Sequence, residues 1–362
     1  MEDNISLDEL FARDPYSLNS DEKEKIFFPM LEALTERHIA NCPEYAAIVE
    51  KTHNKPIRAD LESLPLFPVR LFKEYELRSV KDTDISRAVT SSGTTGQQVS
   101  KVFLDKDTSF AQVRALAKII ASYIGPKRLP LLLLDTEAIR TDPRLFAVRG
   151  AGLMSFFTFG KDATYILDKN MNINWPALET FLEKHGDEPI LMTGYTFMIW
   201  EHVVNALEKA GKRLNINKGY LFHGGGWKKL ADQAVSREEF ARRIHAVMGN
   251  IEVRNYYGMA EQLGSIFVEC EYGHMHCSIF SDVIARRPGD FSPADFNERG
   301  LLQLFSVLPK SYPGHALLTE DEGEILGEDD CPCGRKGKYF KIHGRVKNAE
   351  VRGCSDTYEK RS

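Results

Sequence analysis

Hydroxyl-bearing and glycine residues gather in one short stretch, Thr90-Ser91-Ser92-Gly93-Thr94-Thr95-Gly96-Gln97. Glycine reaches backbone angles closed to other residues, so main-chain N–H groups can approach an anion, and the hydroxyls add donors without bulk. The stretch therefore predicts a phosphate-binding loop. It is not a Walker loop, because only two residues separate Gly93 from Gly96, fewer than that motif requires. The plainer alternative is a flexible polar turn. The candidate ligands are Ser91, Ser92, Thr94 and Thr95, with Gly93 and Gly96.

Four residues in the last third of the chain have the types and spacing of a metal site. Five residues separate Cys270 from His276, and the pair Cys331 and Cys333 follows further along. Three thiolates and one imidazole are enough for a closed tetrahedral zinc site, which leaves no position for water or substrate and is therefore structural. His274 or Cys277 can replace a named ligand. The alternative is a set of reduced thiols that hold no metal.

The elements that must position these residues alternate along the middle of the chain. Apolar runs end in short polar or glycine-rich loops, and amphipathic segments with helical spacing separate them. This alternation predicts an α/β fold with parallel strands, in which ligands bind beyond the carboxyl ends of the strands. Loops at 193–195, 223–226 and 256–258 take that position. The expected strands are 102–104, 131–134, 190–192, 219–222 and 251–255, and the expected helices are 21–41, 43–51, 105–124, 197–210 and 237–248.

Two of these helices have a predicted buried face. In the first, which Ser20 can cap, the shared face holds Ile26, Met30, Leu34 and His38. In the helix at 105–124, the residues at helical spacing are Phe110, Val113, Ala117, Ile120 and Ile124. Both faces are expected to cover a core.

Composition excludes several classes of protein. The chain has 362 residues, 43% of them hydrophobic and 27% charged, and a formal net charge of −5. This balance is ordinary for a soluble globular protein and gives no sign of a surface for nucleic acid or anionic lipid. Residues 1–20 lack the apolar core of a signal peptide, and no stretch approaches the roughly 20 apolar residues of a membrane span. Six cysteines are too few for a disulfide scaffold. We therefore expect a cytoplasmic protein with no nucleic-acid partner and no membrane span.

Five motifs occur in a recognisable order. They are Thr90 to Gly96, His223-Gly-Gly-Gly-Trp-Lys228, Tyr256-Tyr-Gly-Met-Ala-Glu261, Thr319-Glu-Asp321 with Gly323, and His343-Gly344-Arg345. Together they resemble the core motifs of the adenylate-forming (ANL) superfamily, which includes acyl-CoA synthetases. Within it the chain is most similar to the acyl-protein synthetases of bacterial bioluminescence operons (LuxE), and more distantly to phenylacetate-CoA ligase-like enzymes. The resemblance spans roughly residues 60–356.

The resemblance implies an ANL-type N-terminal domain with mixed sheets flanked by helices, and a truncated C-terminal subdomain. We expect a helical segment at 1–60 packed on the main domain, an adenylate-forming core at 61–342 and a short tail at 343–362. Full-length relatives carry a mobile domain with a catalytic lysine at this point, whereas this sequence continues for 17 residues after Arg345. The replacement for that lysine stays open among Lys336, Lys338, Lys341 and Lys347.

The resemblance also assigns roles around ATP. The loop from Ser91 to Gly96 would hold the phosphates, and Lys101, which departs from the Pro-Lys pattern of the family, is the candidate cation beside it. Gly224, Gly225 and Gly226 would lie against the adenine, with His223 near the substrate carboxylate. Because a carboxylate that attacks phosphate brings anions together, such a site needs cations and aimed N–H donors. The plainer alternative for His223 is a satisfied core histidine.

Later motifs would complete the site. Tyr256, Tyr257 and Gly258 would flank the nucleotide, and Glu261 would help to bind Mg²⁺. Asp321 would bond the ribose hydroxyls, and Arg345 would approach the ribose or a phosphate. The alternatives are a helix-start acid at Glu261 and a surface acid at Asp321. Phenylacetate-CoA ligase-like relatives often carry zinc at positions equivalent to the four metal candidates.

The function implied is ATP-dependent activation of a carboxylic acid, a fatty acid, as acyl-AMP, followed by transfer to a thiol. In the LuxE family a near-terminal cysteine is acylated, and Cys354 matches it, with Arg352 nearby to favour the thiolate. Delivery to a partner such as an acyl-CoA reductase would follow. One alternative is a ligase that charges CoA or a carrier protein, and another is a non-catalytic, zinc-stabilised module that binds a nucleotide or partner. Residues 153–160 with Tyr195 can line an acyl pocket or belong to the core.

Overall fold

The computed structural model describes residues 6–53, 60–91, 99–142 and 150–346. The predicted phosphate ligands Ser92 to Gly96, together with Lys347 and Cys354, lie outside these residues. The chain divides into two compact units. Unit 1 combines Met1–Ser91, Gln98–Ser122 and Gly258–Glu350, and the described part of unit 2 is 123–142 and 150–257. Helices flank mixed sheets, which confirms the predicted fold class.

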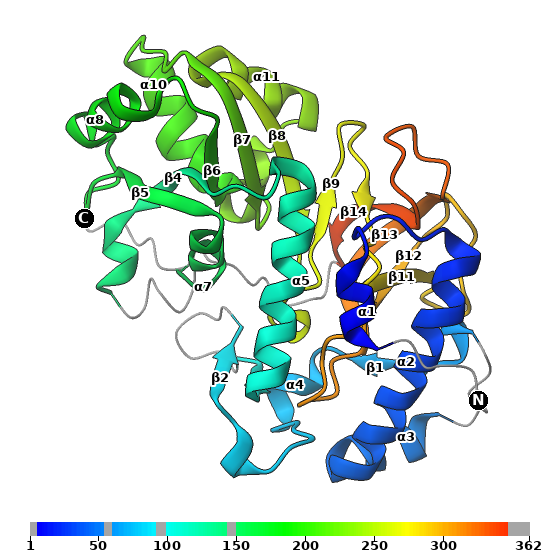
Figure 1. Ribbon diagram of the computed structural model, residues 1–362. Coiled ribbons are helices and arrows are strands. Elements are labelled where there is room, and N and C mark those ends of the chain that lie inside the picture. Colours follow the sequence, from blue (N-terminus) through cyan, green and yellow to red (C-terminus); the bar gives the residue numbers. More distant parts are fainter. Residues whose placement is uncertain (1–5, 54–59, 92–98, 143–149, 347–362) are drawn as a thin grey trace. The chain divides into compact units, whose positions relative to one another are not determined.

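Unit 2 contains a parallel sheet with the strand order β8-β7-β6-β4-β5. The strands are β4 (Leu129–Thr136), β5 (Gly160–Leu167), β6 (Ile190–Tyr195), β7 (Ile216–Gly224) and β8 (Gly249–Tyr257). Every residue of β4 is buried, as expected of a strand covered on both faces. The helices are α7 (Ala151–Met154), α8 (Trp175–His185), α9 (Thr196–Met198), α10 (Asn205–Lys209) and α11 (Arg237–Met248). Their apolar side chains and those of the strands form one core, and Figure 1 shows α8, α10 and α11 beside the sheet.

Unit 1 contains a mainly antiparallel sheet with the order β11-β12-β13-β14-β10-β9. The strands are β9 (Phe267–Glu269), β10 (Met275–His276), β11 (Ser281–Arg286), β12 (Arg299–Ser306), β13 (Ala316–Glu328) and β14 (Lys338–Arg345). A short strand, β1 (Phe67–Pro68), pairs parallel to β13. A separate ribbon joins β2 (Arg87–Thr90) to β3 (Lys101–Leu104).

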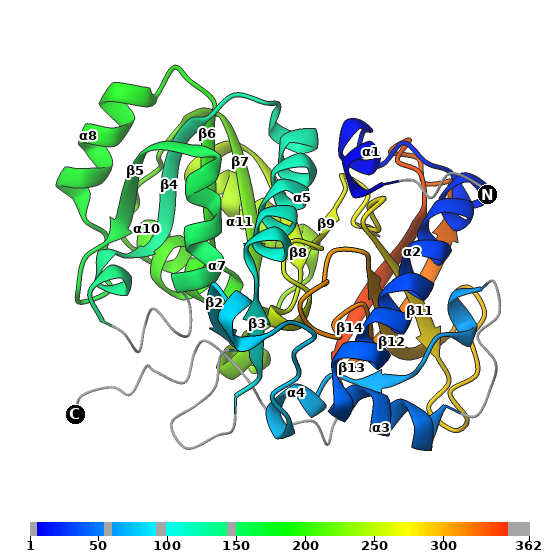
Figure 2. The same ribbon diagram turned by 60° about the horizontal axis from the view of Figure 1, so that its bottom comes forward.

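The helices of unit 1 come mainly from the start of the chain. They are α1 (Leu7–Ala12), α2 (Ser20–Asn41), α3 (Pro43–Thr52), α4 (Leu71–Glu74) and α5 (Lys106–Ile124). Asn19 caps α2 in a capping box with Glu22, which satisfies N–H groups that the first turn leaves free. Figure 2 shows α2 lying along the sheet of unit 1. There the Lys23 ammonium binds the Asp282 carboxylate of β11 at 2.8 Å, with both side chains buried.

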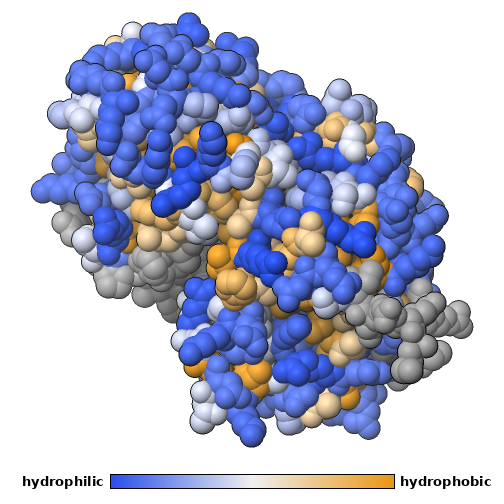
Figure 3. Space-filling view, viewed as in Figure 1, coloured by the Kyte–Doolittle hydropathy of each residue, from blue (hydrophilic) through white to orange (hydrophobic). Residues whose placement is uncertain are grey.

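All the strands and helices expected from the sequence are present, with ends shifted by one or a few residues. Within the described residues no helix is both long and apolar enough to span a bilayer. Hydrophilic side chains cover most of the face seen in Figure 3, in keeping with a sequence that is 27% charged.

Candidate active site

The β2–β3 ribbon closes the base of the predicted phosphate loop. Thr90 pairs with Lys101 across the ribbon, and the next residue, Ser91, donates its N–H to the Ser100 carbonyl at 3.0 Å. The Ser91 hydroxyl accepts from Ser100 N–H at 2.9 Å. Ser91 therefore fixes the two ends of the loop against each other. Lys101 Nζ lies 3.0 Å from Glu76 Oε1 on the exposed surface, and this contact lowers the pKa of Glu76.

Two of the glycines predicted to face the nucleotide require the backbone that glycine allows. Gly225 and Gly226 follow β7 with φ values of 81° and 62°, in the left-handed region that other residues avoid. A Cβ on Gly224 would lie 2.9 Å from the Tyr256 carbonyl oxygen, so only glycine lets β7 end this close to β8. The Tyr256 ring packs on Phe156, 5.9 Å away between centroids. The structure thus brings Gly224 and Tyr256 together at the carboxyl edge of the parallel sheet.

His223 is in register with Gly194 of β6 and Asn255 of β8. Its Nδ1 lies 2.9 Å from Thr196 Oγ1, and its ring packs against Phe240 at 4.7 Å between centroids. Burial, and secondarily the charge of Arg237, lowers the pKa of His223 to about 3. The ring is therefore neutral at physiological pH, and its surroundings are compatible with either the catalytic or the core interpretation.

Glu261 lies in the short turn Ala260–Gln262 of unit 1 and is buried. The neighbouring Gln262 amide donates to the carbonyl oxygens of Leu304 at 3.1 Å and Gly314 at 2.8 Å. Burial raises the pKa of Tyr312, and the charge of Glu261 raises it further. Glu261 is therefore a buried carboxyl group in a fixed turn, and a bound cation would stabilise its ionised form. This setting fits the predicted Mg²⁺ ligand.

Asp321 and Arg345 meet although 23 residues separate them in the sequence. They are directly opposite each other on β13 and β14, and Arg345 Nε lies 3.6 Å from Asp321 Oδ1. The Asp321 N–H donates to Thr319 Oγ1 at 3.1 Å, and this bond fixes the backbone of Asp321 relative to Thr319. Two residues predicted to touch one nucleotide are thus neighbours.

The predicted nucleotide residues fall into two groups. His223 to Tyr257 belong to unit 2, whereas Ser91, Lys101 and the residues from Gly258 to Arg345 belong to unit 1. Within each group, neighbouring strands bring together residues that are distant in the sequence. The convergence of both groups on one ATP molecule stays a prediction.

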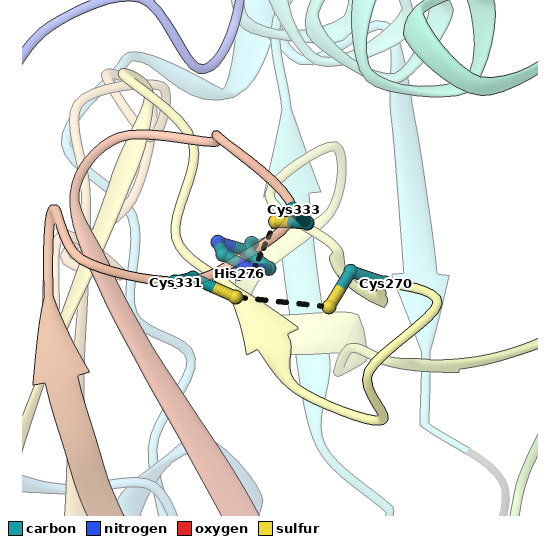
Figure 4. Close-up of side chains that lie close together, drawn as sticks. All are labelled: Cys270, His276, Cys331 and Cys333. Carbon is teal, nitrogen blue, oxygen red and sulfur yellow. Dashed lines mark hydrogen bonds between the residues drawn. The ribbon is translucent and has the colours of Figure 1, made fainter.

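The four predicted metal ligands form one cluster in unit 1. Their ligand atoms all lie within 4.8 Å of one another, and Figure 4 shows the side chains facing a common centre. Cys270 Sγ is 4.0 Å from Cys331 Sγ, and Cys333 Sγ is 3.3 Å from His276 Nε2. Tetrahedral zinc with Zn–S bonds of about 2.3 Å places two sulfurs about 3.8 Å apart. The donor set and its spacing therefore fit zinc.

The protonation chemistry of this cluster also fits a cation. Burial raises the pKa of Cys331 to about 12, and burial lowers the pKa of His276 to about 3. The imidazole is then in the neutral form that binds metals, while the thiols need a nearby positive charge to ionise. His274, the alternative ligand, contacts Cys331 with Nδ1 3.2 Å from Sγ and stacks on Tyr339. Cys277 is buried and is not among the four clustered residues.

Comparisons with known proteins agree with the motifs. The family model of LuxE, acyl-protein synthetase, matches residues 2–361. The chain belongs to the LuxE family. A long-chain-fatty-acid–luciferin-component ligase of Vibrio harveyi is 22% identical to it over 359 residues, covering 96% of this chain and 91% of that protein. A ligase of the same name from Aliivibrio fischeri is 22% identical over 360 residues, covering 96% and 92%.

A solved structure shares the fold of this LuxE family member. The open conformation of 2-hydroxyisobutyryl-CoA ligase, in complex with 2-HIB-AMP and CoA, superimposes with a TM-score of 0.67 at 16% identity. The alignment covers 92% of this chain and 77% of that chain. The fold expected from the motifs is thereby confirmed.

Sequence reasoning missed several residues of this LuxE chain that hold the candidate site residues in place. Thr196 contacts His223, and Gln262 anchors the Glu261 turn. Gln112 of α5 donates to the Tyr312 hydroxyl at 3.0 Å, deep in unit 1. A polar residue predicted inside a helix or directly after an apolar strand is the signal that could have pointed to Gln112 and Thr196.

Proposed function

We propose that this LuxE family member uses ATP to activate a fatty acid as acyl-AMP and then transfers the acyl group to a thiol. The match of the family model to residues 2–361 carries the proposal. The names of the relatives, long-chain-fatty-acid–luciferin-component ligases, support the substrate class. The loops of unit 2 at the carboxyl edge of a parallel sheet support a small-molecule site there.

The residues of the chain would divide the work. In the first step a carboxylate oxygen bonds to the α-phosphorus and the bond to pyrophosphate breaks. Gly224 to Gly226 would receive the adenine beside Tyr256 and Tyr257, and Asp321 would bond the ribose. Arg345 would add positive charge near the phosphates. Glu261 would hold Mg²⁺, which when bound offsets phosphate charge.

In the second step a thiolate attacks the acyl carbonyl and AMP leaves. Cys354 is the proposed acceptor, and an acyl-CoA reductase the proposed recipient; CoA or a carrier protein are the competing acceptors. We further propose a structural zinc ion at Cys270, His276, Cys331 and Cys333, and the division into a helical segment at 1–60, a core at 61–342 and a tail at 343–362. A cytoplasmic location also stays a prediction.

Pyrophosphate release tests the first step. Purified protein with MgATP is offered a panel of saturated, unsaturated and aromatic carboxylic acids of increasing length. Acid-dependent release is expected, strongest with a long-chain acid. Asp321→Asn should raise the KM for ATP, whereas Glu322→Gln on the same strand should leave it close to wild type. A protein that binds ATP but releases no pyrophosphate with any acid would be the non-catalytic module instead.

Mass spectrometry of the intact protein tests the second step. After reaction with the best acid, we expect an acyl adduct on wild-type protein and on Cys42→Ser, whose cysteine is buried elsewhere in unit 1. Cys354→Ser should release pyrophosphate but carry no adduct. Rapid acyl-CoA formation by Cys354→Ser would instead identify CoA as the direct acceptor.

A further inference from the structure

The loop between β12 and β13 contains a short segment, residues 311–314, that is buried in unit 1. The Ser311 hydroxyl donates to the Phe103 carbonyl of β3 at 2.9 Å, and the Ser311 carbonyl accepts from Ser79 N–H at 2.7 Å. Both directions are fixed, because a carbonyl oxygen can only accept. Ser311 therefore holds β3 from outside the β2–β3 ribbon.

The other end of the segment contacts the turn that carries Glu261. The Gln262 side-chain amide donates to the Gly314 carbonyl at 2.8 Å. A Cβ on Gly314 would lie 2.6 Å from the Glu261 carbonyl oxygen, so only glycine lets the two backbones approach this closely. Segment 311–314 therefore binds β3 at one end and the Glu261 turn at the other, although these two elements are far apart in the sequence.

The position of β3 also sets the position of Ser91, a residue of the predicted phosphate loop. Ser91 N–H donates to the Ser100 carbonyl, and Ser91 Oγ accepts from Ser100 N–H. Neither contact uses the hydroxyl proton of Ser91, so this proton is available for a phosphate oxygen. Because Ser100 directly precedes β3, a contact that holds β3 also holds Ser91.

We propose that segment 311–314 is a positioning element that sets the distance between Ser91 and Glu261, with Ser311 as its contact to the phosphate side. The inference rests on the proposed function, in which Ser91 binds a phosphate of ATP and Glu261 holds Mg²⁺. A metal ion that bridges phosphate oxygens needs its carboxylate ligand and the phosphate donors at one separation. A buried segment that is hydrogen-bonded at both ends meets this need, because little water reaches these bonds to compete for them.

Equilibrium binding of two nucleotides tests the role of Ser311. MgATP carries the phosphates that Ser91 and Mg²⁺ would engage, whereas metal-free AMP lacks the terminal ones. In Ser311→Ala we expect MgATP to bind about tenfold more weakly, the effect of one hydrogen bond, and AMP to bind as in wild type. Ser278→Ala is the matched control, because Ser278 is fully buried in unit 1 and its hydroxyl accepts from Phe280 N–H at 3.2 Å. This control should leave both affinities unchanged.

A double-mutant cycle tests the coupling through the segment. Gln262→Met removes the amide donor to Gly314 and keeps a side chain of similar length, and it should also weaken MgATP binding about tenfold. If both contacts serve one separation, the double variant Ser311→Ala/Gln262→Met loses little more than either single variant. Independent contacts would instead multiply to a loss of about a hundredfold. Ser278→Ala combined with Gln262→Met should give the simple product of the two single effects.

The results decide the proposal in either direction. Equal weakening of MgATP and AMP in Ser311→Ala, or unchanged MgATP binding, would overturn it, and a fully multiplicative loss in the double variant would remove the coupling.

If Ser311→Ala does not fold, amide hydrogen exchange of wild type decides instead. Magnesium pyrophosphate should slow exchange at Ser79 N–H, which Ser311 accepts, because a ligand that holds β3 also stabilises the contacts of Ser311. AMP should not slow it, and an exchange rate that magnesium pyrophosphate leaves unchanged would overturn the proposal. If wild type binds MgATP but no acid supports pyrophosphate release, the proposed function fails, while the nucleotide affinities still decide the role of segment 311–314.

Discussion

Asp282→Asn removes the negative charge at the centre of a buried ion cluster in unit 1. Asp282 Oδ2 lies 2.8 Å from Lys23 Nζ of α2, and its Oδ1 lies 3.2 Å from Lys338 Nζ of β14. The side chains of Lys23 and Asp282 are only 4% and 6% exposed. Lys23 also donates to the Ser281 carbonyl at 2.7 Å. The substitution therefore leaves two ammonium groups in a poorly solvated site, with Glu328 as a remaining acid near both.

Two estimates of the loss can be compared. Removing one partner of a buried ion pair costs about 3–5 kcal/mol, because the remaining charge stays buried without compensation. Burial by itself raises the pKa of Asp282, but Lys23 and Lys338 outweigh burial and hold the pKa at about 2. Against an unfolded value of about 3.9, this shift corresponds to about 3 kcal/mol in favour of the folded state. The free energy obtained from the pKa shift measures only how much the folded state favours the ionised acid. We therefore expect Asp282→Asn to lower the free energy of unfolding by at least that amount.

Urea denaturation followed by circular dichroism at pH 7 measures the effect. Asp84→Asn, an exposed acid in the same unit, is the control and should stay within about 0.5 kcal/mol of wild type. Because the folded-state pKa of Asp282 lies below its unfolded value, its contribution is complete above about pH 4 and is lost as pH falls through about 2. Wild type and Asp282→Asn should therefore converge in stability in acid. A variant as stable as the control at pH 7 would refute the reasoning.

Three further predictions concern other features. Metal analysis should find about one zinc per purified wild-type chain, much less in Cys331→Ser, and unchanged zinc in Cys42→Ser; a metal-free wild type would remove the site. Gly264→Ala should destabilise more than Gly125→Ala, because both have φ near 80° but only the Cβ at Gly264 would meet backbone, the Gln112 oxygen at 2.5 Å; equal urea midpoints would contradict this. Burial, the largest cause, lowers the pKa of His38 to about 3, so the neutral ring stabilises the folded state above about pH 6.5 and this stabilisation is lost on acidification. Between pH 6.5 and pH 5 the loss is about 2 kcal/mol. The variant His38→Gln should therefore show a flatter profile of urea midpoint against pH.

The parallel sheet of unit 2 was the part most readily predicted. Two of its strands contain a continuous apolar run, at 131–134 in β4 and at 190–192 in β6, and a polar residue follows each run. Such apolar runs are local sequence signals, and they are pronounced here because strands of a parallel sheet are buried on both faces. The same argument placed the loops of His223 and Tyr256 at one edge, where the structure brings them together. The antiparallel strands of unit 1 have shorter and mixed patterns, and the sequence analysis did not find their pairing.

The predicted faces of two helices were partly wrong, for a physical reason. On α5, Phe110 is 68% and Val113 47% exposed, whereas the polar Gln112 is buried against Tyr312. On α2, Lys23 was not on the predicted face but is buried in the ion cluster. His38 was on the predicted face and is buried, in a contact with Ser79 at 2.7 Å. Helical periodicity counts apolar residues and so cannot recognise a polar residue whose partner comes from a distant strand or loop. Such partners lie more than 40 residues away in three of these contacts: 41 for His38, 200 for Gln112 and 258 for the Lys23 bond to Ser281.

The same limit explains why residues 1–60 had no assigned role in the sequence. The hairpin that carries Cys331 and Cys333 also holds the start of α2: Lys336 N–H donates to the Tyr16 carbonyl at 3.1 Å, and Ser20 N–H donates to Asp329 Oδ2 at 2.8 Å. Asp329 Oδ1 accepts from Gly337 N–H at 2.8 Å, so one carboxylate both closes the hairpin and binds the helix. An ion that joined these cysteines to the remaining two ligands would immobilise the hairpin, and with it the N-terminal segment. The local sequence of the hairpin indicates only metal chemistry. Its second role depends on the backbone carbonyl at 16, which every residue has, and on the backbone N–H at 20, which every residue except proline has.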